Sequence, residues 1–154
     1  MDTKPQMNAD EARIIADEAE GDGGLARDDG GYPLKGVTEK IIGAAFEVHR
    51  ELGSGFLEKV YETALVLELR NRGMAVATQR AVPIEYKDQP VGVYYADLVV
   101  ENSVLCEIKA TEGLLPVHES QLLHYLKATG ITVGLLINFG AQRVQVKRLI
   151  RSKR

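Results

Sequence analysis

Two carboxylates and one amine lie close together in the second half of the chain, at Asp97, Glu107 and Lys109. Side chains alternate across a β-strand, so Glu107 and Lys109 share one face of the apolar segment around them. The other face carries residues suited to a core, namely Val104, Cys106, Ile108 and Ala110. The pattern predicts a strand that presents an acid and an amine on the same side.

The turn before this strand decides whether Asp97 joins the other two residues. A three-residue reversal at 101–103 would pair Val100 with Val104. Counting back from that pair places Asp97 opposite Glu107, with Cβ atoms about 5 Å apart. A two-residue turn would instead place the two acids on opposite faces. A shared site therefore requires the three-residue turn.

Two neighbouring carboxylates on a partly dry surface favour a bound cation, because burial and mutual repulsion disfavour their charged forms. Mg²⁺ takes oxygen ligands and keeps several waters, so two carboxylates and a backbone carbonyl leave positions for a phosphate oxygen and an attacking water. Lys109 would orient that water or stabilise the charge that develops on the phosphate. The chemistry indicated is the hydrolysis of a phosphodiester bond.

The alternative is that Glu107 and Lys109 form only the outward face of a half-exposed strand. Asp97 argues against this alternative. Its expected neighbours on the same face, Tyr95 and Val99, are bulky and largely apolar, which is a costly setting for a carboxylate without a partner.

The elements expected to position these residues are mixed. Helical spacing predicts helices over residues 38–52, 56–72 and 116–128, with Thr38 as an N-cap and Gly73 and Gly130 as C-terminal stops. Alternating or β-branched segments predict strands over residues 74–86, 92–100, 104–110, 131–138 and 143–150. This order predicts an α/β fold with a mixed β-sheet flanked by helices.

The composition is that of one globular domain with an acidic extension. The chain has 154 residues, of which 45% are apolar and 27% charged. Residues 1–35 hold 9 acidic and 4 basic side chains (net −5) and are rich in glycine, which predicts a flexible arm with at most a short helix over 9–19. Residues 36–154 hold 13 acidic and 15 basic side chains (net +2) and form the predicted domain. Its basic residues cluster near the end: Arg143, Lys147, Arg148, Arg151, Lys153 and Arg154.

Several classes of protein and site are not indicated. No apolar stretch approaches the roughly 18 residues of a membrane helix, and the polar N-terminus does not resemble a signal peptide, so we expect a cytoplasmic protein. The single cysteine, Cys106, cannot form an internal disulfide and is expected to be a buried small side chain. The spacing of His118 and His124 does not allow a helical zinc pair.

Three segments resemble a known superfamily. Asp97 followed by Glu107-Ile108-Lys109 is similar to the D…ExK signature of the PD-(D/E)XK nuclease superfamily, although Ala96 stands where that signature often has proline. Residues 55–61, Gly-Phe-Leu-Glu-Lys-Val-Tyr, resemble the motif that names the bacterial GxxExxY protein family, and this similarity extends from about residue 38 to residue 150. Gln121 and Tyr125 resemble the Q-x-x-x-Y helix of RecB-like nucleases.

The resemblance implies a restriction-endonuclease-like core and a role for each matching residue. Asp97, Glu107 and the Ile108 carbonyl would bind Mg²⁺ or Mn²⁺, and Lys109 would be the catalytic lysine. The remaining residues implied are Glu58 as an additional acid, and Gln121, Tyr125 and His118 on one stripe of a helix.

The function expected is a metal-dependent nuclease that acts on nucleic acid, DNA rather than RNA. An alternative is a non-catalytic module on the same fold that binds nucleic acid or a partner through the basic C-terminal edge. A third hypothesis is that the acidic arm covers the site as a mimic of a polyanion.

Overall fold

The computed structural model describes residues 33–152, so the predicted helix over 9–19 and nearly all of the predicted arm lie outside the described residues. The described part contains, in chain order, α2 (Lys35–Leu52), α3 (Glu58–Asn71), β1 (Val76–Tyr86), β2 (Gln89–Val100), β3 (Val104–Lys109), α4 (Pro116–Thr129), β4 (Val133–Asn138) and β5 (Gln145–Ile150). The strands form one sheet in the order β1-β2-β3-β4-β5. Only β3 and β4 run parallel, and α4 connects them. The predicted mixed sheet flanked by helices is confirmed.

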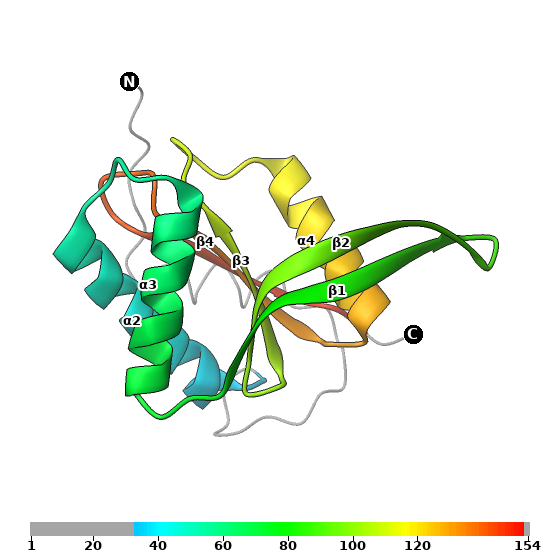
Figure 1. Cartoon of the computed structure of the whole chain (residues 1–154), viewed down its shortest axis with the longest axis horizontal. Helices are drawn as coiled ribbons and strands as arrows, with labels where there is room; N and C mark the ends of the chain where they lie inside the picture. The colour runs from blue at the N-terminus through cyan, green and yellow to red at the C-terminus, as the bar shows by residue number, and fades with distance from the viewer. Residues whose placement is uncertain (1–32, 153–154) are drawn as a thin grey trace.

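Helices cover both faces of the sheet, with α2 and α3 on one side and α4 on the other (Figure 1). The larger apolar core joins α2 and α3 to the sheet and includes Cys106 and Ile108. A second core joins α4 to the opposite face and includes Val99 and Leu105. Both faces of β3 are therefore buried, as expected for a strand with a parallel neighbour in a sheet covered on both sides.

α2 begins one turn earlier than predicted, because Thr38 is not its N-cap. Thr38 is buried within the helix, and its hydroxyl donates to the carbonyl oxygens of Leu34 (3.2 Å) and Lys35 (3.1 Å). A threonine hydroxyl inside a helix commonly bonds back to the preceding turn in this way. The C-terminal stops of the other two helices are confirmed, since Gly73 and Gly130 both have positive φ angles.

The turn between α2 and α3 is closed by Tyr61, the last residue of the GxxExxY-like segment. Gly53 and Gly55 have positive φ angles, and the Tyr61 hydroxyl donates to the Gly53 carbonyl oxygen (2.6 Å) while accepting the Phe56 N–H (3.2 Å). The Tyr61 ring stacks on Phe139 at 4.8 Å. This tyrosine therefore fixes the start of α3 against the end of β4.

β1 and β2 form a long hairpin that extends beyond the helices (Figure 1). The predicted gap between the strands over 74–86 and 92–100 is too long, because Lys87 and Asp88 form a two-residue turn in which both have positive φ angles. Such a turn matches the right-handed twist of paired strands. Strand β2 consequently begins at Gln89 and is three residues longer than predicted.

No helix within the described residues is long and apolar enough to span a membrane.

Candidate functional site

The turn between β2 and β3 has the three-residue form that a shared site requires. Val100 pairs with Val104, and the Ser103 N–H donates to the Val100 carbonyl oxygen (3.0 Å). Glu101 and Asn102 take positive φ angles of 51° and 53°. The predicted register is confirmed.

Regular pairing of these strands stops at Leu98 and Cys106, immediately before the two acids. Beyond this point, the carboxylates of Asp97 and Glu107 accept backbone N–H groups of the opposite strand, in place of hydrogen bonds between the two backbones. The Asp97 N–H donates to Glu107 Oε1 (3.1 Å), and the Ile108 N–H donates to Asp97 Oδ2 (2.8 Å). The two side chains thus lie together in the space where β2 and β3 separate.

The alternation of side chains along β2 breaks at Asp97. Ala96 belongs to the core under α4, whereas Leu98 belongs to the core under α2 and α3, although strict alternation would place both on one face. Tyr95 is consequently exposed, and the expectation that it lines the same face as Asp97 is not met. The irregularity extends to β1, where Gln79 has a φ of 49° and is missing from the pairing with β2. A second irregularity, a shift in register, lies further along the hairpin between Ile84 and Glu85.

Glu107 is only 6% exposed, which excludes the alternative that it lies on an outward face. Its burial, followed by repulsion from Asp97, raises the pKa of Glu107 to about 9. A hydrogen bond from the Asp97 N–H and the charge of Lys109 oppose this rise in pKa. A cation bound between the two carboxylates would reverse the balance by favouring their charged forms.

The Ile108 carbonyl points to the same gap. The Lys109 carbonyl oxygen accepts the Phe139 N–H (2.8 Å), so the polar backbone groups of Lys109 are directed at the chain that follows β4. Backbone groups of successive strand residues point to opposite sides, and the Ile108 N–H indeed bonds to Asp97. The Ile108 carbonyl is therefore directed towards β2, on the side of the carboxylates.

Lys109 lies at the end of β3, where a polar network holds the following residues. Asn138 Oδ1 accepts the N–H groups of Thr111 (2.9 Å) and Gly140 (3.0 Å), and Asn138 Nδ2 donates to the Thr111 carbonyl (2.9 Å) and to Gln145 (2.9 Å). Asn138 is fully buried. Asn138 therefore connects the segments that follow β3 and β4, close in sequence to Lys109.

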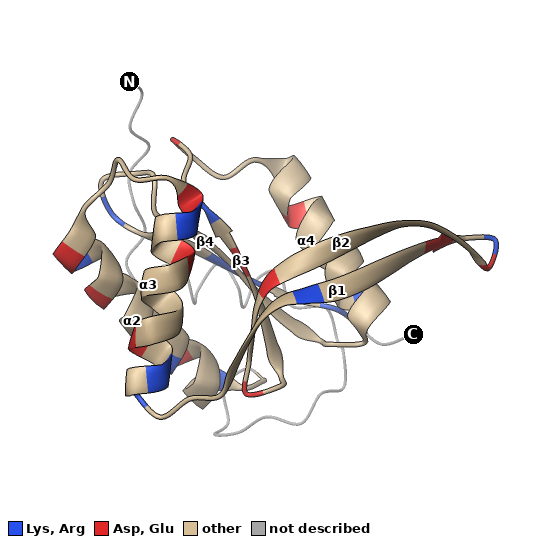
Figure 2. Ribbon diagram, viewed as in Figure 1, with Lys and Arg blue, Asp and Glu red and all other residues tan. Residues whose placement is uncertain are grey.

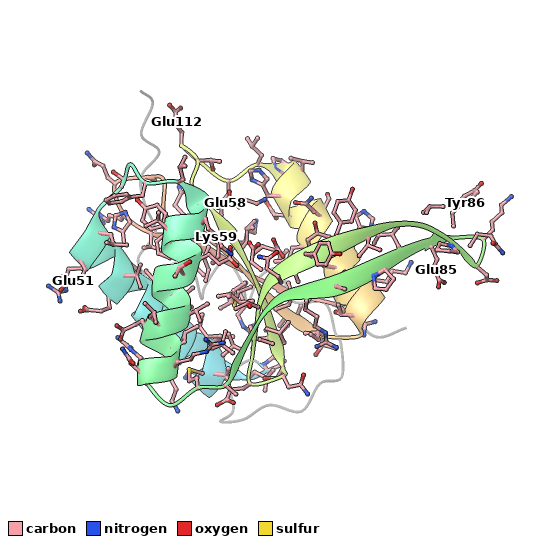
Figure 3. The ribbon with its side chains drawn as sticks, in the orientation of Figure 1. Glu51, Glu58, Lys59, Glu85, Tyr86 and Glu112 are labelled. Atoms are coloured by element: carbon pink, nitrogen blue, oxygen red, sulfur yellow. The ribbon has the colours of Figure 1, made fainter. Side chains whose placement is uncertain are left out.

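Two acids reach the site from α3. Glu58 is exposed, and its pKa is raised by partial burial against the opposing effect of Lys109, with Asp97 and Glu62 raising it further. The charges of Lys109 and Asp97 therefore reach Glu58. Figure 3 shows Glu58 at the first turn of α3, and Figure 2 shows acidic residues on α3, β2 and β3 near the centre of the molecule.

Glu62, one helical turn after Glu58, was missed by the sequence analysis. It is 5% exposed, and its Oε1 accepts a hydrogen bond from Gln79 Nε2 (2.7 Å) and lies 3.4 Å from Lys59 Nζ. The same Gln79 nitrogen lies 3.3 Å from Asp97 Oδ1. Gln79 therefore connects the α3 acid to the sheet acid. The i, i+4 spacing from Glu58 was the only signal in the sequence that pointed to Glu62.

The predicted stripe on α4 lies at the edge of the site. Burial, then Glu107, Tyr94 and Asp97, raises the pKa of Tyr125 to about 12, so this phenol lies within the field of both carboxylates. Gln121 lines an open pocket together with Tyr125.

His118 has a structural partner on its own helix. Its Nδ1 accepts the Leu115 N–H (3.1 Å) and so caps the start of α4. Burial, with a further effect of Lys109, lowers the pKa of His118.

Two residues of the predicted basic edge are neutralised or buried, whereas Arg143 is exposed. Arg148 is 1% exposed, and one of its guanidinium nitrogens donates to the Pro33 carbonyl oxygen. Lys147 forms an ion pair with Glu119 (2.8 Å). Lys153 and Arg154 lie outside the described residues.

The donor groups present fit a hard cation that keeps most of its waters. Within residues 33–152, no group of three or more His, Cys, Asp and Glu side chains is arranged to hold a metal ion by itself. Asp97 and Glu107 offer two adjoining carboxylates, and the Ile108 carbonyl points to the same gap. Two carboxylates and a carbonyl suit Mg²⁺, which is rarely held by side chains alone.

Comparisons with known proteins found a solved structure and a family model that resemble the chain. One solved structure that resembles the chain is described as "Crystal structure of SSO0001", with 20% identity and a TM-score of 0.47. The match covers 63% of this chain and 52% of the other, so the chain spans about half the length of that protein. No curated protein matches the sequence. The family model described as "PD-(D/E)XK nuclease superfamily" matches residues 35–149, from the start of α2 nearly to the end of β5, and the chain therefore belongs to the PD-(D/E)XK nuclease superfamily.

Proposed function

We propose that this protein is a metal-dependent nuclease that hydrolyses phosphodiester bonds in nucleic acid, with DNA a better substrate than RNA. Asp97, Glu107 and the Ile108 carbonyl are its ligands for Mg²⁺ or Mn²⁺. The observation that supports this most strongly is the pair of adjoining, partly or fully buried carboxylates at the point where β2 and β3 separate. Nucleases of this superfamily typically use divalent metals.

Each residue has a distinct role in the proposal. A bound divalent ion supplies Lewis acidity and offsets the negative charge of the phosphate. Lys109 orients the attacking water and stabilises the charge that develops on the phosphate oxygens. Glu58 lies beside Lys109 and helps to hold its ammonium group in place. Gln121 and Tyr125 contact the substrate from α4.

Glu62 and Gln79 are positioning residues in this proposal. The Gln79 amide restrains Asp97 Oδ1, and the buried Glu62 restrains the Gln79 amide. Outer groups of this kind orient metal ligands and raise metal affinity.

We further propose that the chain belongs to the GxxExxY branch of the superfamily, and that the motif combines two tasks. Its glutamate, Glu58, faces the candidate site, whereas its tyrosine, Tyr61, closes the turn that places the glutamate there. On this basis, Tyr61→Phe should lower stability more than it lowers the rate of the chemical step.

The test is a cleavage assay on single-stranded DNA, duplex DNA and RNA with Mg²⁺ or Mn²⁺. The wild type should cleave at least one DNA substrate, and EDTA should abolish cleavage. Lys109→Ala and Asp97→Asn should lose more than about 100-fold in rate, because each removes a group that acts on the transition state or holds the metal. Circular dichroism checks that both variants fold.

The matched controls are the same substitutions, Lys to Ala and Asp to Asn, at positions outside the candidate site. Lys40→Ala on α2 and Asp88→Asn in the hairpin turn remove a charge from exposed positions and should leave cleavage unchanged. Metal-independent cleavage, or full activity in Lys109→Ala, would contradict the proposed mechanism. Binding of nucleic acid without cleavage, insensitive to Asp97→Asn, would instead indicate the non-catalytic module.

A further inference from the structure

An open pocket of about 840 Å³ lies between the β1–β2 hairpin and α4. Its walls are Ile84 and Tyr94 on the hairpin, and Val117, Gln121, His124 and Tyr125 on α4. The volume is within the roughly 300–1,000 Å³ typical of pockets that hold small organic groups.

Tyr125 connects the pocket to the two strands that carry the candidate site. Tyr125 packs in the same buried cluster as Ala96, which precedes Asp97, and Leu105, which lies two residues before Glu107 on the same strand. The field of Glu107 and Asp97 reaches its phenol group.

Tyr94 gives the pocket an exposed aromatic face. Its side chain is 52% exposed, and its ring rests against the buried ring of Tyr125, with centroids 5.6 Å apart and planes inclined by 46°. The contact with the Tyr125 ring already restricts the Tyr94 side chain. Tyr94 therefore loses less conformational entropy when another ring stacks on it. Planar bases stack on aromatic side chains of this kind irrespective of their sequence.

The pocket combines apolar and aromatic walls with few charged side chains. Lys127 and His124 lie on its α4 side, and Glu85 is its one acidic lining residue. Figure 2 shows few charged residues along the hairpin between its base and its end. Glu85 and Tyr86 lie towards that end (Figure 3). An apolar wall with one lysine at its side fits a base inside and a phosphate of the strand outside.

We propose that this pocket binds an unpaired base of the substrate strand by stacking it on Tyr94, so that the protein acts on single-stranded or unpaired nucleic acid. The inference rests on the proposed function for its link to cleavage. A base inside a duplex cannot present its face to Tyr94 without leaving the helix. Single strands should therefore bind more tightly than duplexes of the same sequence.

The experiment measures the affinity of a fluorescently labelled single strand of about 12 nucleotides by anisotropy, with EDTA present to prevent cleavage. Tyr94→Ala should weaken binding by about tenfold, within the range expected for the loss of one stacked base, and Tyr94→Phe should bind as the wild type does. DNA and RNA strands, each with a duplex counterpart, distinguish the two sources of the base.

The neighbouring tyrosine provides the matched control. Tyr95 is 57% exposed on the same strand but does not line the pocket, so Tyr95→Ala should change the affinity less than twofold. Val117→Glu, at an exposed pocket residue on α4, should also weaken binding, because it sets a carboxylate against the phosphates. This second variant tests the pocket if Tyr94→Ala does not fold.

An abasic strand separates stacking from contacts to phosphate. Its affinity for the wild type should fall to that of Tyr94→Ala, and Tyr94→Ala should bind it no more weakly than the wild type does. Equal effects of Tyr94→Ala and Tyr95→Ala, or equal affinities for base-containing and abasic strands, would overturn the inference while leaving cleavage intact. Tyr94-dependent binding without metal-dependent cleavage would instead overturn the proposed hydrolysis and keep the pocket.

Discussion

Glu107 is the residue whose ionisation couples the candidate site to stability. Burial and the adjacent Asp97 raise the pKa of Glu107 to about 9, whereas the ordinary value for a glutamate is 4.5. Between these two pH values, the folded state holds a proton that the unfolded chain has released. The contribution of this group to stability is therefore fully present below about pH 4.5 and falls as the pH rises towards about 9.

Replacement of Glu107 with glutamine should remove this dependence on pH. In the absence of metal, the melting temperature of the wild type should fall from about pH 5 to about pH 9 more steeply than that of Glu107→Gln, whose amide oxygen can still accept the Asp97 N–H. Scanning calorimetry across this range measures both slopes. Glu85→Gln, at an exposed hairpin position, should retain the wild-type slope. Parallel curves for the wild type and Glu107→Gln would contradict the raised pKa.

Gln79 is the second residue with a distinct prediction. Its amide bridges Glu62 and Asp97, and its φ of 49° is a conformation that glutamine rarely adopts. Gln79→Ala should lower metal affinity or activity by about 10- to 100-fold, because loss of an orienting hydrogen bond leaves Asp97 less well placed. Thr78→Ala, at the preceding exposed position, is the control. Unchanged metal dependence in Gln79→Ala would show that Asp97 does not need the bridge.

At the scale of elements, the ends of β3 and β4 hold Lys109 in place. Asn138 ties the two ends together, and Gly140 approaches the Thr111 backbone so closely that an added Cβ would lie 2.3 Å from its nitrogen. No real side chain fits at that distance from backbone atoms. The close approach is therefore a constraint on the sequence at position 140.

Gly140→Ala should accordingly destabilise the protein by about 1–3 kcal/mol, because the backbone near Thr111 must move. Cleavage should also decrease if Lys109 moves with it. Gly92→Ala is the matched control, since a Cβ at Gly92 meets nothing within 4 Å and its backbone is not in the left-handed region. Urea denaturation measures both variants. Equal midpoints for the two variants would contradict the constraint.

The sequence predicted the elements better than it predicted the break between them. Alternation along β3 and the three-residue turn were enough to place Asp97 near Glu107, because register follows from local chain geometry. Local patterns could not predict that pairing would stop at Leu98, or that Asp97 would accept the Ile108 N–H instead. Gln79 and Glu62 are 17 residues apart in sequence, and their contact depends on how α3 packs on the sheet.

At the scale of the whole molecule, the candidate site lies where the layers of the fold meet. α3 brings Glu58 and Glu62 from one side of the sheet, β2 and β3 supply the central acids and the lysine, and α4 contributes Tyr125 from the other side. Within this region Glu62 and Glu107 are buried, which strengthens the charge interactions that these two acids make. Without a cation, Glu107 keeps a proton at neutral pH, and a cation bound between the two acids would replace that proton.

Calorimetric titration of the purified protein with Mn²⁺ at about pH 7 tests that claim most directly. We predict binding that releases a proton from Glu107, so that the measured enthalpy changes with the ionisation enthalpy of the buffer. Asp97→Asn should lose this binding, whereas Lys109→Ala and the control Asp88→Asn should retain it. No binding by the wild type, or equal binding by Asp97→Asn, would contradict a metal site between β2 and β3.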